Sequence, residues 1–222
     1  MPRASKRAAP VREPNLRGMN SAYLWSFIAA NLAIFLTLVL NRQFTGSSVE
    51  HLWEGITKKN GIIAAIIPIL AIFLSGALSD MGKARLVFWR WHNPLPGCRA
   101  FTELVRTDPR IDLPALLRKH GDFPQDPKAQ NAFWYRLYRG HKTTRMVWES
   151  HKIYLLTRDL TTISAVFAVL FSIGVVAASV SWKTALLYVG ALIMQYMLVA
   201  SAAQSYGNRF VLNVLSEESF TP

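Results

Sequence analysis

Four uninterrupted apolar stretches constrain this sequence more than any other feature. None of them contains Lys, Arg, Asp, Glu or His, and each is 19 to 21 residues long. A helix needs about 20 predominantly apolar residues to cross a hydrocarbon core roughly 30 Å thick. The sequence therefore predicts an all-α integral membrane protein with four transmembrane helices, at residues 22–40, 61–79, 160–180 and 184–203.

The four predicted spans form two hairpins with one long segment between them. Hairpin 1 covers residues 21–79, and hairpin 2 covers residues 159–216. Apolar residues at helical spacing continue past the last span as far as Leu215. We therefore expect the fourth helix to extend out of the membrane, followed by a polar, frayed tail at residues 217–222.

Residues 80–158 are predicted to form a helical cytosolic domain between the second and third spans. Asp112 stands two residues before Pro114, and Asp126 stands directly before Pro127, which is the signature of a helix N-terminus. Asp112 is expected to open a short helix that ends at Gly121. Asp126 is expected to open a longer helix that Gly140 closes.

The two ends of this domain are predicted to join the membrane differently. Pro94 and Pro96 break the helix that leaves the second span, because proline disfavours helix in the residue before it. Residues 99–106 can resume a helix. Neither Pro nor Gly interrupts residues 144–173, so one long helix is expected to run from the domain into the third span.

Most of the positive charge lies on one side of the predicted membrane. The chain carries 25 Lys and Arg against 13 Asp and Glu, a net charge of +12. Placing both termini with residues 80–158 puts 21 of the 25 basic residues on that side, which the positive-inside rule makes the cytoplasm. We expect a multi-pass protein of the bacterial inner (plasma) membrane, with membrane lipids as partners of the basic residues. Nucleic-acid binding by the basic and aromatic central segment is the less favoured alternative.

Residues 1–20 are basic and contain prolines, which predicts a disordered segment in contact with lipid headgroups. The apolar run that follows is long, and no small-residue cleavage site comes after it. We therefore expect a retained membrane anchor and not a cleaved signal peptide. An organelle transit peptide is the alternative.

Six residues of the predicted spans are candidates for helix packing or for lining a pore. Asn31 and Gln195 are amides inside uncharged helices, and a buried amide must find a hydrogen-bond partner. Pro68 removes a backbone hydrogen bond, which predicts a kink in the second span. Small residues at every fourth position let helices approach closely, within one chain or between copies. In the third span these are Ser164, Ala168 and Ser172.

Two groups of side chains in the central segment are candidates for binding. Guanidinium groups bind phosphates and lipid headgroups, so one group is predicted to contact an anionic ligand or lipid. Its members are Arg85, Arg90, Arg99, Arg136, Arg139 and Arg145. The second group is an aromatic face on the helix that Asp126 opens, and it is predicted to dock a cytosolic protein partner. It comprises Trp134, Tyr135 and Tyr138.

Catalytic and metal-binding signatures are not found in the sequence. No pair of histidines has metal-ligand spacing, and a lone Cys98 forms no ligand set. Nucleotide-binding and hydrolase motifs are also missing. The uncharged spans argue against a proton-coupled carrier. We therefore expect no enzymatic activity, no metal and no cofactor.

The function favoured by these features is that of an oligomeric membrane sensor or effector. Its cytosolic domain would receive a signal or partner and transmit it to the spans, which would open a pore or perturb the bilayer in stress or anti-phage defence. One alternative is a membrane anchor or scaffold that recruits a soluble partner. Another is a membrane enzyme that acts on lipid or nucleotide phosphate through the arginines.

Overall fold

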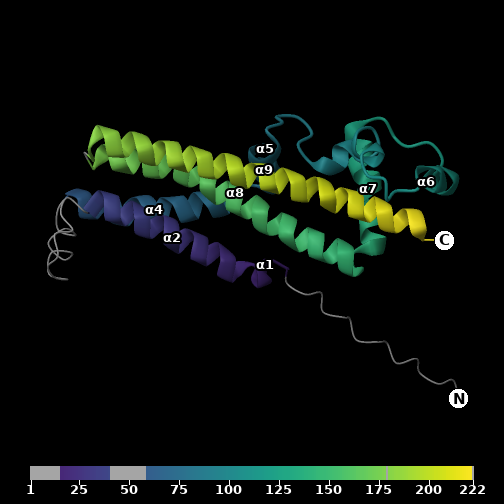
Figure 1. Ribbon diagram of the computed structural model, residues 1–222, viewed down its shortest axis with the longest axis horizontal. Helices are drawn as coiled ribbons and strands as arrows, with labels where there is room; N and C mark the ends of the chain where they lie inside the picture. Colours follow the sequence, from purple (N-terminus) through teal and green to yellow (C-terminus); the bar gives the residue numbers. More distant parts are fainter. Residues whose placement is uncertain (1–15, 41–58, 179, 222) are drawn as a thin grey trace, which may run out of the picture.

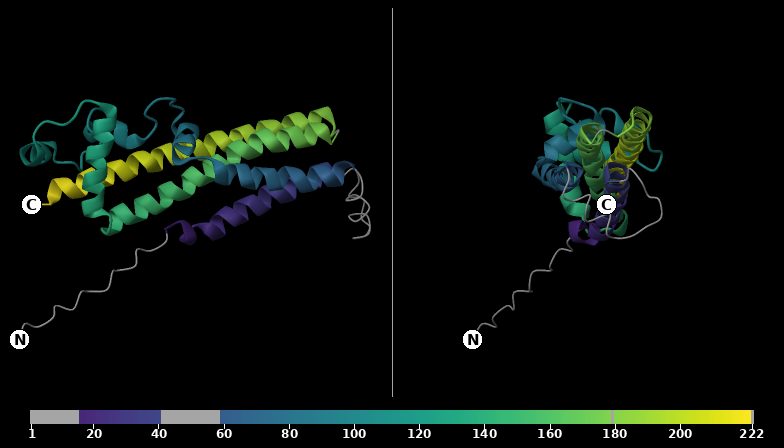
Figure 2. Two further views of the ribbon diagram at one scale, coloured as in Figure 1. Left: turned by 180° about the vertical axis from the view of Figure 1, so that it is seen from behind. Right: turned by 90° about the vertical axis from the view of Figure 1, so that its left-hand side faces the viewer.

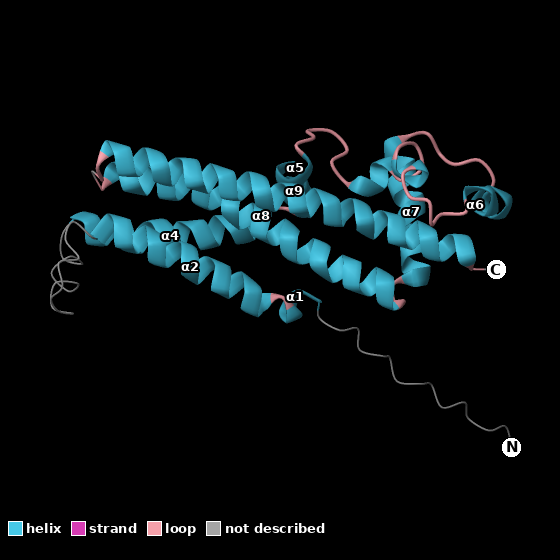
Figure 3. Ribbon diagram, viewed as in Figure 1, coloured by secondary structure: helices cyan, strands magenta, loops and turns pink. Residues whose placement is uncertain are grey.

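The computed structural model describes residues 16–40, 59–178 and 180–221, so most of the predicted disordered segment lies outside the described residues (Figure 1). This part of the chain consists of helices and loops, and Figure 3 shows no strand in it. The all-α prediction is therefore confirmed for the described residues. The α-helices are α1 (Leu16–Met19), α2 (Ser21–Leu40), α4 (Lys59–Ala77), α5 (Asp80–Phe88), α6 (Leu113–His120), α7 (Pro127–His141), α8 (Arg145–Ala177) and α9 (Trp182–Phe220), with 3₁₀ turns η1 (Pro96–Arg99) and η2 (Leu104–Arg106).

A long antiparallel pair, α8 and α9, runs the length of the molecule (Figures 1 and 2). At one end, α2 and α4 pack beside α8. At the other end, α6 and α7 pack against the last part of α9. With 33 and 39 residues, the two helices measure about 50 and 58 Å, well beyond the roughly 30 Å of a hydrocarbon core. The predicted continuous helix over 144–173 is confirmed, since α8 is unbroken from Arg145 to Ala177.

Within the described residues, three helices are long and apolar enough to cross a membrane: α2, α8 and α9. The pair α4 and α5 makes a fourth candidate if it counts as one bent span. The chain is therefore a multi-pass membrane protein with three to four candidate spans. We call the part formed by residues 79–158 the lobe.

The chain leaves α4 at a different place from the one predicted. A bend of 101° separates α4 from α5, well before Pro94 and Pro96. The hydroxyl of Ser79 accepts a hydrogen bond from the backbone N–H of Gly82 and so caps a new helix. Asp80, in the first turn of that helix, is favoured by the positive end of the helix dipole. By contrast, α4 continues as helix through Pro68, and the sharp turn comes ten residues later.

The predicted helices of the lobe are largely confirmed. Asp112 and Asp126 cap α6 and α7 by accepting from backbone N–H groups three residues on. Gly121 follows α6 with φ of +70°, a conformation that suits glycine. The predicted stop at Gly140 is wrong, because Gly140 stays helical and α7 runs on to His141.

A buried glutamine explains why residues 99–106 do not form the predicted helix. The Gln130 side chain is 1% exposed. Its Oε1 accepts from the backbone N–H groups of Phe101 (3.1 Å) and Thr102 (3.3 Å). Those donors are thereby drawn away from a regular helical pattern, and the segment is held as the turns η1 and η2.

The C-terminal region also differs from the prediction. The expected frayed tail is in fact part of α9, which continues to Phe220. Glu218 and Ser219 are buried, at 7% and 9% exposure. The polar residues at this end are ordered because the lobe surrounds them.

Two separate apolar cores lie along the helix pair. Beside α2 and α4, the core is built on a stack of rings in which Phe35 and Phe167 lie 4.3 and 4.4 Å from Phe171. The lobe has its own core, and α9 supplies much of it, including Phe210 and Val214. The lobe is thus packed directly on the extension of a candidate span.

Two glycines are expected to resist enlargement. A Cβ on Gly207 would lie 2.8 Å from Phe88 Cζ and 2.9 Å from Tyr154 Cε2, and one on Gly174 would lie 2.6 Å from Phe35 Cζ. Gly207→Ala and Gly174→Ala are each expected to lower the free energy of unfolding by about 1–3 kcal/mol because rings must shift. The measurement is chemical denaturation in detergent micelles.

Gly190→Ala is the matched control, because a Cβ there meets no atom within 4 Å. Alanine favours helix over glycine by up to about 1 kcal/mol, so this variant should be as stable as the wild type or more so. Equal stability of all three variants would contradict the packing described here.

Candidate functional site

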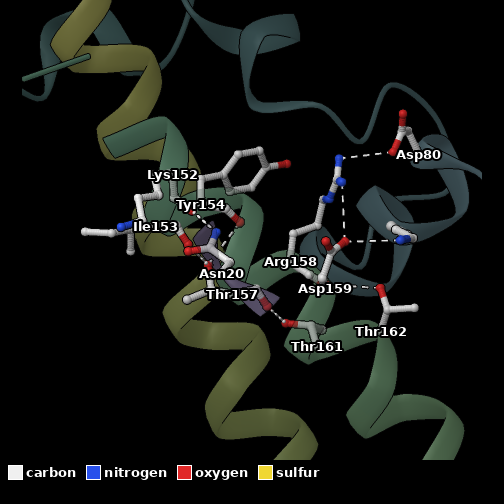
Figure 4. A network of polar contacts seen from close by, with 11 residues as sticks. Asn20, Asp80, Lys152, Ile153, Tyr154, Thr157, Arg158, Asp159, Thr161 and Thr162 are labelled. Carbon is white, nitrogen blue, oxygen red and sulfur yellow. Dashed lines mark hydrogen bonds and ion pairs between the residues drawn. The ribbon is translucent and has the colours of Figure 1, made fainter. Parts of the chain in front are cut away.

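Four charged residues gather where α5 and α8 meet, and we call them the junction cluster. They are Asp80 and Lys83 of α5 with Arg158 and Asp159 of α8. Lys83 Nζ lies 3.1 Å from Asp159 Oδ1. The Arg158 guanidinium reaches Asp80 Oδ1 at 3.2 Å and Asp159 Oδ1 at 3.3 Å (Figure 4). With two acids and two bases, the cluster is neutral overall.

The bend between α4 and α5 creates this arrangement. Because the new helix starts at Asp80, its first turn faces α8 just before the uncharged stretch that begins at Leu160. Arg158 is 7% exposed, and a buried charge requires counter-charges close by. Thr157, Thr161 and Thr162 donate back to carbonyls of α8 itself, so their hydroxyls do not compete for the ions.

The two amides inside the spans meet each other. Gln195 Nε2 donates to Asn31 Oδ1 at 3.1 Å, and Asn31 Nδ2 donates to the Phe27 carbonyl at 3.0 Å. Asn31 is 6% exposed. The pair links α2 to α9 and satisfies polar groups that the hydrocarbon cannot. This geometry serves helix packing.

The other residues predicted for packing or a pore lie in the same region. Pro68 is buried on α4. On α8, Ser164 is fully buried, and its hydroxyl has no partner among the described residues. Ser172 Oγ donates to the carbonyl of half-buried Ala168 at 2.5 Å. The two roles proposed for these residues, helix packing and lining a pore, stay predictions.

The six predicted arginines do not converge on one ligand site in the described structure. Arg90 and Arg99 share Glu103, at 3.8 and 3.3 Å. Arg85 stacks on the ring of Trp91 and donates to its carbonyl. The remaining three are exposed. On α7, Arg136 stacks on the ring of Phe133, and Arg139 lies on the same helix. On α8, Arg145 pairs with Glu149.

The predicted docking face is mostly internal. Trp134 is 7% exposed and packs edge-on against Phe210 of α9, 5.2 Å away. Tyr138 stacks on Trp134 and shares a 3.0 Å hydrogen bond with His151. Tyr135 alone of the three is largely exposed, at 52%. In this conformation the face belongs to the core of the lobe, because α9 covers it.

A second polar cluster holds the end of α9, and we call it the Glu218 cluster. Glu218 Oε1 lies 2.8 Å from Lys119 Nζ and 2.9 Å from His120 Nε2. Its Oε2 lies 2.5 Å from His141 Nε2. One carboxylate of α9 thereby joins α6 and α7.

The pKa of Glu218 is lowered by these contacts. Burial by itself raises the pKa, but hydrogen bonds from Lys119, His141 and His120 outweigh it and lower the pKa from 4.5 to about 2. Sequence reasoning missed this cluster, because its members lie 98 and 77 residues apart. The one local indication in the sequence is the acidic pair Glu217–Glu218, which follows the apolar helical positions that end at Leu215.

Among the described residues, no group of three or more His, Cys, Asp or Glu side chains is arranged to hold a metal ion. Comparisons of the chain with protein-family models, with curated proteins and with solved structures give no match. The structure itself therefore defines the class: an all-helical, multi-pass membrane protein in which a helical lobe is built on the extension of its candidate spans.

Proposed function

We propose that this protein transmits a change of state from its lobe to its membrane helices. In this proposal four spans form two hairpins, and the lobe and both termini lie on the cytoplasmic side of a bacterial inner membrane, because 21 of the 25 basic residues are then on that side. The observation that carries the proposal is the continuity of α8 and α9, each an unbroken helix from the lobe into an uncharged stretch.

The lobe acts on α9 through its own core. Phe210, Val211, Val214 and Leu215 of α9 are buried among lobe residues, and the Glu218 cluster ties the end of the helix to α6 and α7. A rearrangement of α6 and α7 therefore displaces α9 directly. Packed interfaces switch between discrete arrangements and do not deform smoothly.

The junction cluster passes the change to the second helix pair. Arg158 of α8 is bound to Asp80, directly after the bend that ends α4. Movement of α8 along its axis thus pulls on α5 and α4. The response we propose is repacking of the spans in a homo-oligomer, which opens a pore or perturbs the bilayer in stress or anti-phage defence.

Apolar surface is available on the candidate spans for contact with lipid or with a second copy of the chain. Exposed apolar side chains cover α4 and α9, including Phe73 at 74% and Leu187 at 76%. A second candidate function, an anchor that recruits a soluble partner, is favoured by the exposed Tyr135 beside Arg136 and Arg139 on α7. A partner that binds there would also be placed to act on α9 through α7.

Transmission is tested by measuring the distance between two spans in a variant that weakens the Glu218 cluster between the lobe and α9. Spin labels on Phe73→Cys and Leu187→Cys, with Cys98→Ala, report the separation of α4 and α9 in lipid nanodiscs. Glu218→Gln is expected to shift the distance distribution, whereas the neighbouring Glu217→Gln is not. A Gly-Pro insertion after Ile153 should remove the shift, since it breaks α8. An unchanged distribution in Glu218→Gln would refute transmission.

The orientation is tested separately by labelling intact cells with a membrane-impermeant maleimide. Trp182→Cys, at the first position of α9 and 76% exposed, should react from outside. Tyr135→Cys should react only after the membrane is permeabilised. The reverse pattern would overturn the cytoplasmic location of the lobe.

A further inference from the structure

An open cleft lies between α2, α4 and α8, directly beside the junction cluster. Its volume is about 250 Å³. Apolar walls come from Leu24 and Ile28 of α2, Ile72 of α4, and Phe167 of α8. Lys83 and Asp159 line the cleft at its charged end.

The position of the cleft fixes its chemical surroundings. Charged side chains end at Asp159 on α8, and the uncharged stretch begins with the next residue. One end of the cleft is therefore level with lipid headgroups, and the rest faces acyl chains. Pockets for drug-sized ligands measure about 300–1,000 Å³, so this smaller cleft suits a single chain segment.

The charged end is suited to a headgroup that carries both signs. Lys83 and Asp159 are paired at 3.1 Å with side chains 14% and 16% exposed, so both can be reached. An ammonium and a carboxylate side by side match a phosphate and an amine. Because the junction cluster is neutral overall, a headgroup with net negative charge would leave an excess charge there, whereas a zwitterion would not.

We propose that this cleft binds a phospholipid from the leaflet that faces the lobe, with an amine-bearing zwitterionic headgroup. One acyl chain lies along the apolar walls. Lys83 donates to the phosphate, and Asp159 accepts from the headgroup ammonium. This assignment goes beyond the transmission of a signal and does not depend on it.

Gly76 provides the test, because it lines the cleft and a Cβ there meets no atom within 4 Å. Gly76→Leu is expected to fill part of the cleft, since its Cβ has open space. Gly190→Leu on α9 is the matched control, since its Cβ is equally unobstructed and it does not line the cleft.

The purified protein is equilibrated with mixed vesicles of phosphatidylethanolamine and phosphatidylglycerol, extracted in mild detergent, and weighed intact by native mass spectrometry. Wild type and Gly190→Leu should retain phosphatidylethanolamine in preference. Gly76→Leu should retain at least fivefold less. Asp159→Asn should lose the preference for phosphatidylethanolamine, because Lys83 alone favours an anion.

Three outcomes would overturn the proposal. They are equal retention by Gly76→Leu and wild type, a wild-type preference for phosphatidylglycerol, and no retained lipid in wild type. If Asp159→Asn does not fold, Gly76→Leu still decides whether the cleft is occupied, and the wild-type preference still decides the headgroup. Neither the amount of retained lipid nor the headgroup preference involves a distance between spans. A negative result for the lipid site is therefore distinct from a negative result in the spin-label test of transmission.

Discussion

Replacing Glu218 with glutamine is expected to lower the free energy of unfolding by about 3 kcal/mol near neutral pH, as a carboxyl with pKa lowered from 4.5 to about 2 implies. The variant keeps the size of the side chain but removes the charge that holds Lys119, His120 and His141 together. Denaturation in detergent micelles, followed by tryptophan fluorescence, measures the loss. Glu217→Gln, one residue away and outside the cluster, should change stability by less than about 0.5 kcal/mol.

The same carboxylate makes stability depend on pH. Its pKa is lower in the folded state than in the unfolded state, so its contribution is complete above about pH 4.5 and is lost as the pH falls toward 2. His151 acts in the same direction at higher pH. Burial, assisted by the charge of Arg158, lowers its pKa from 6.5 to about 4, and its contribution is lost as the pH falls through that range.

Wild type should therefore lose stability in two pH ranges on acidification. Glu218→Gln should keep the loss between about pH 6.5 and 4 and should lose less than wild type between about pH 4.5 and 2, where Asp108 still contributes because its hydrogen bond with Arg110 lowers its pKa. Unfolding titrations in micelles at several pH values separate the two ranges. A wild-type protein as stable at pH 3 as at pH 7 would contradict the environments assigned to both residues.

Arg158→Met is expected to lower the free energy of unfolding by about 1.5–3 kcal/mol, the usual contribution of hydrogen bonds to a charged group. Among the described residues, Asp159, whose side chain is 16% exposed, would keep only Lys83 as a basic partner. Methionine preserves the apolar stem of the side chain. Asp80 and Asp159 each lose an ion pair with the guanidinium. Thermal or chemical unfolding in micelles gives the loss directly.

Arg145→Met is the matched control on the same helix. Arg145 pairs with Glu149, but its side chain is 91% exposed, and exposed pairs contribute about 0–1 kcal/mol. Equal effects of the two arginine substitutions would show that the junction cluster does not stabilise the fold.

Features carried by neighbouring residues were predictable from the sequence. Asp112 and Asp126 cap their helices through backbone groups three residues away. The uninterrupted α8 follows from the lack of Pro and Gly over residues 144–173, and the candidate spans follow from the apolar stretches. In each case the determining interaction is local or compositional, and a linear pattern contains it.

Features that depend on distant residues were not predictable. Gln130 reshapes residues 99–106 from another element, and Trp134 is internal because α9 covers it. Asn31 and Gln195 were identified as amides in need of partners, but their pairing spans 164 residues. The Ser79 cap is a local interaction, but the prediction placed the break of this helix at Pro94 and Pro96 instead.

The dependence of the lobe on α9 also bears on how the protein is made. α9 follows α6 and α7 in the sequence, and Glu218 is synthesised 77 residues after its partner His141. At about 5–20 residues per second, ribosomes take roughly 4–15 s to cover that interval. Meanwhile the apolar faces of α6 and α7, with Leu116 and Trp134, have been synthesised without the helix that covers them. For several seconds during translation, the nascent lobe is therefore prone to aggregate. This period ends when α9 has been synthesised.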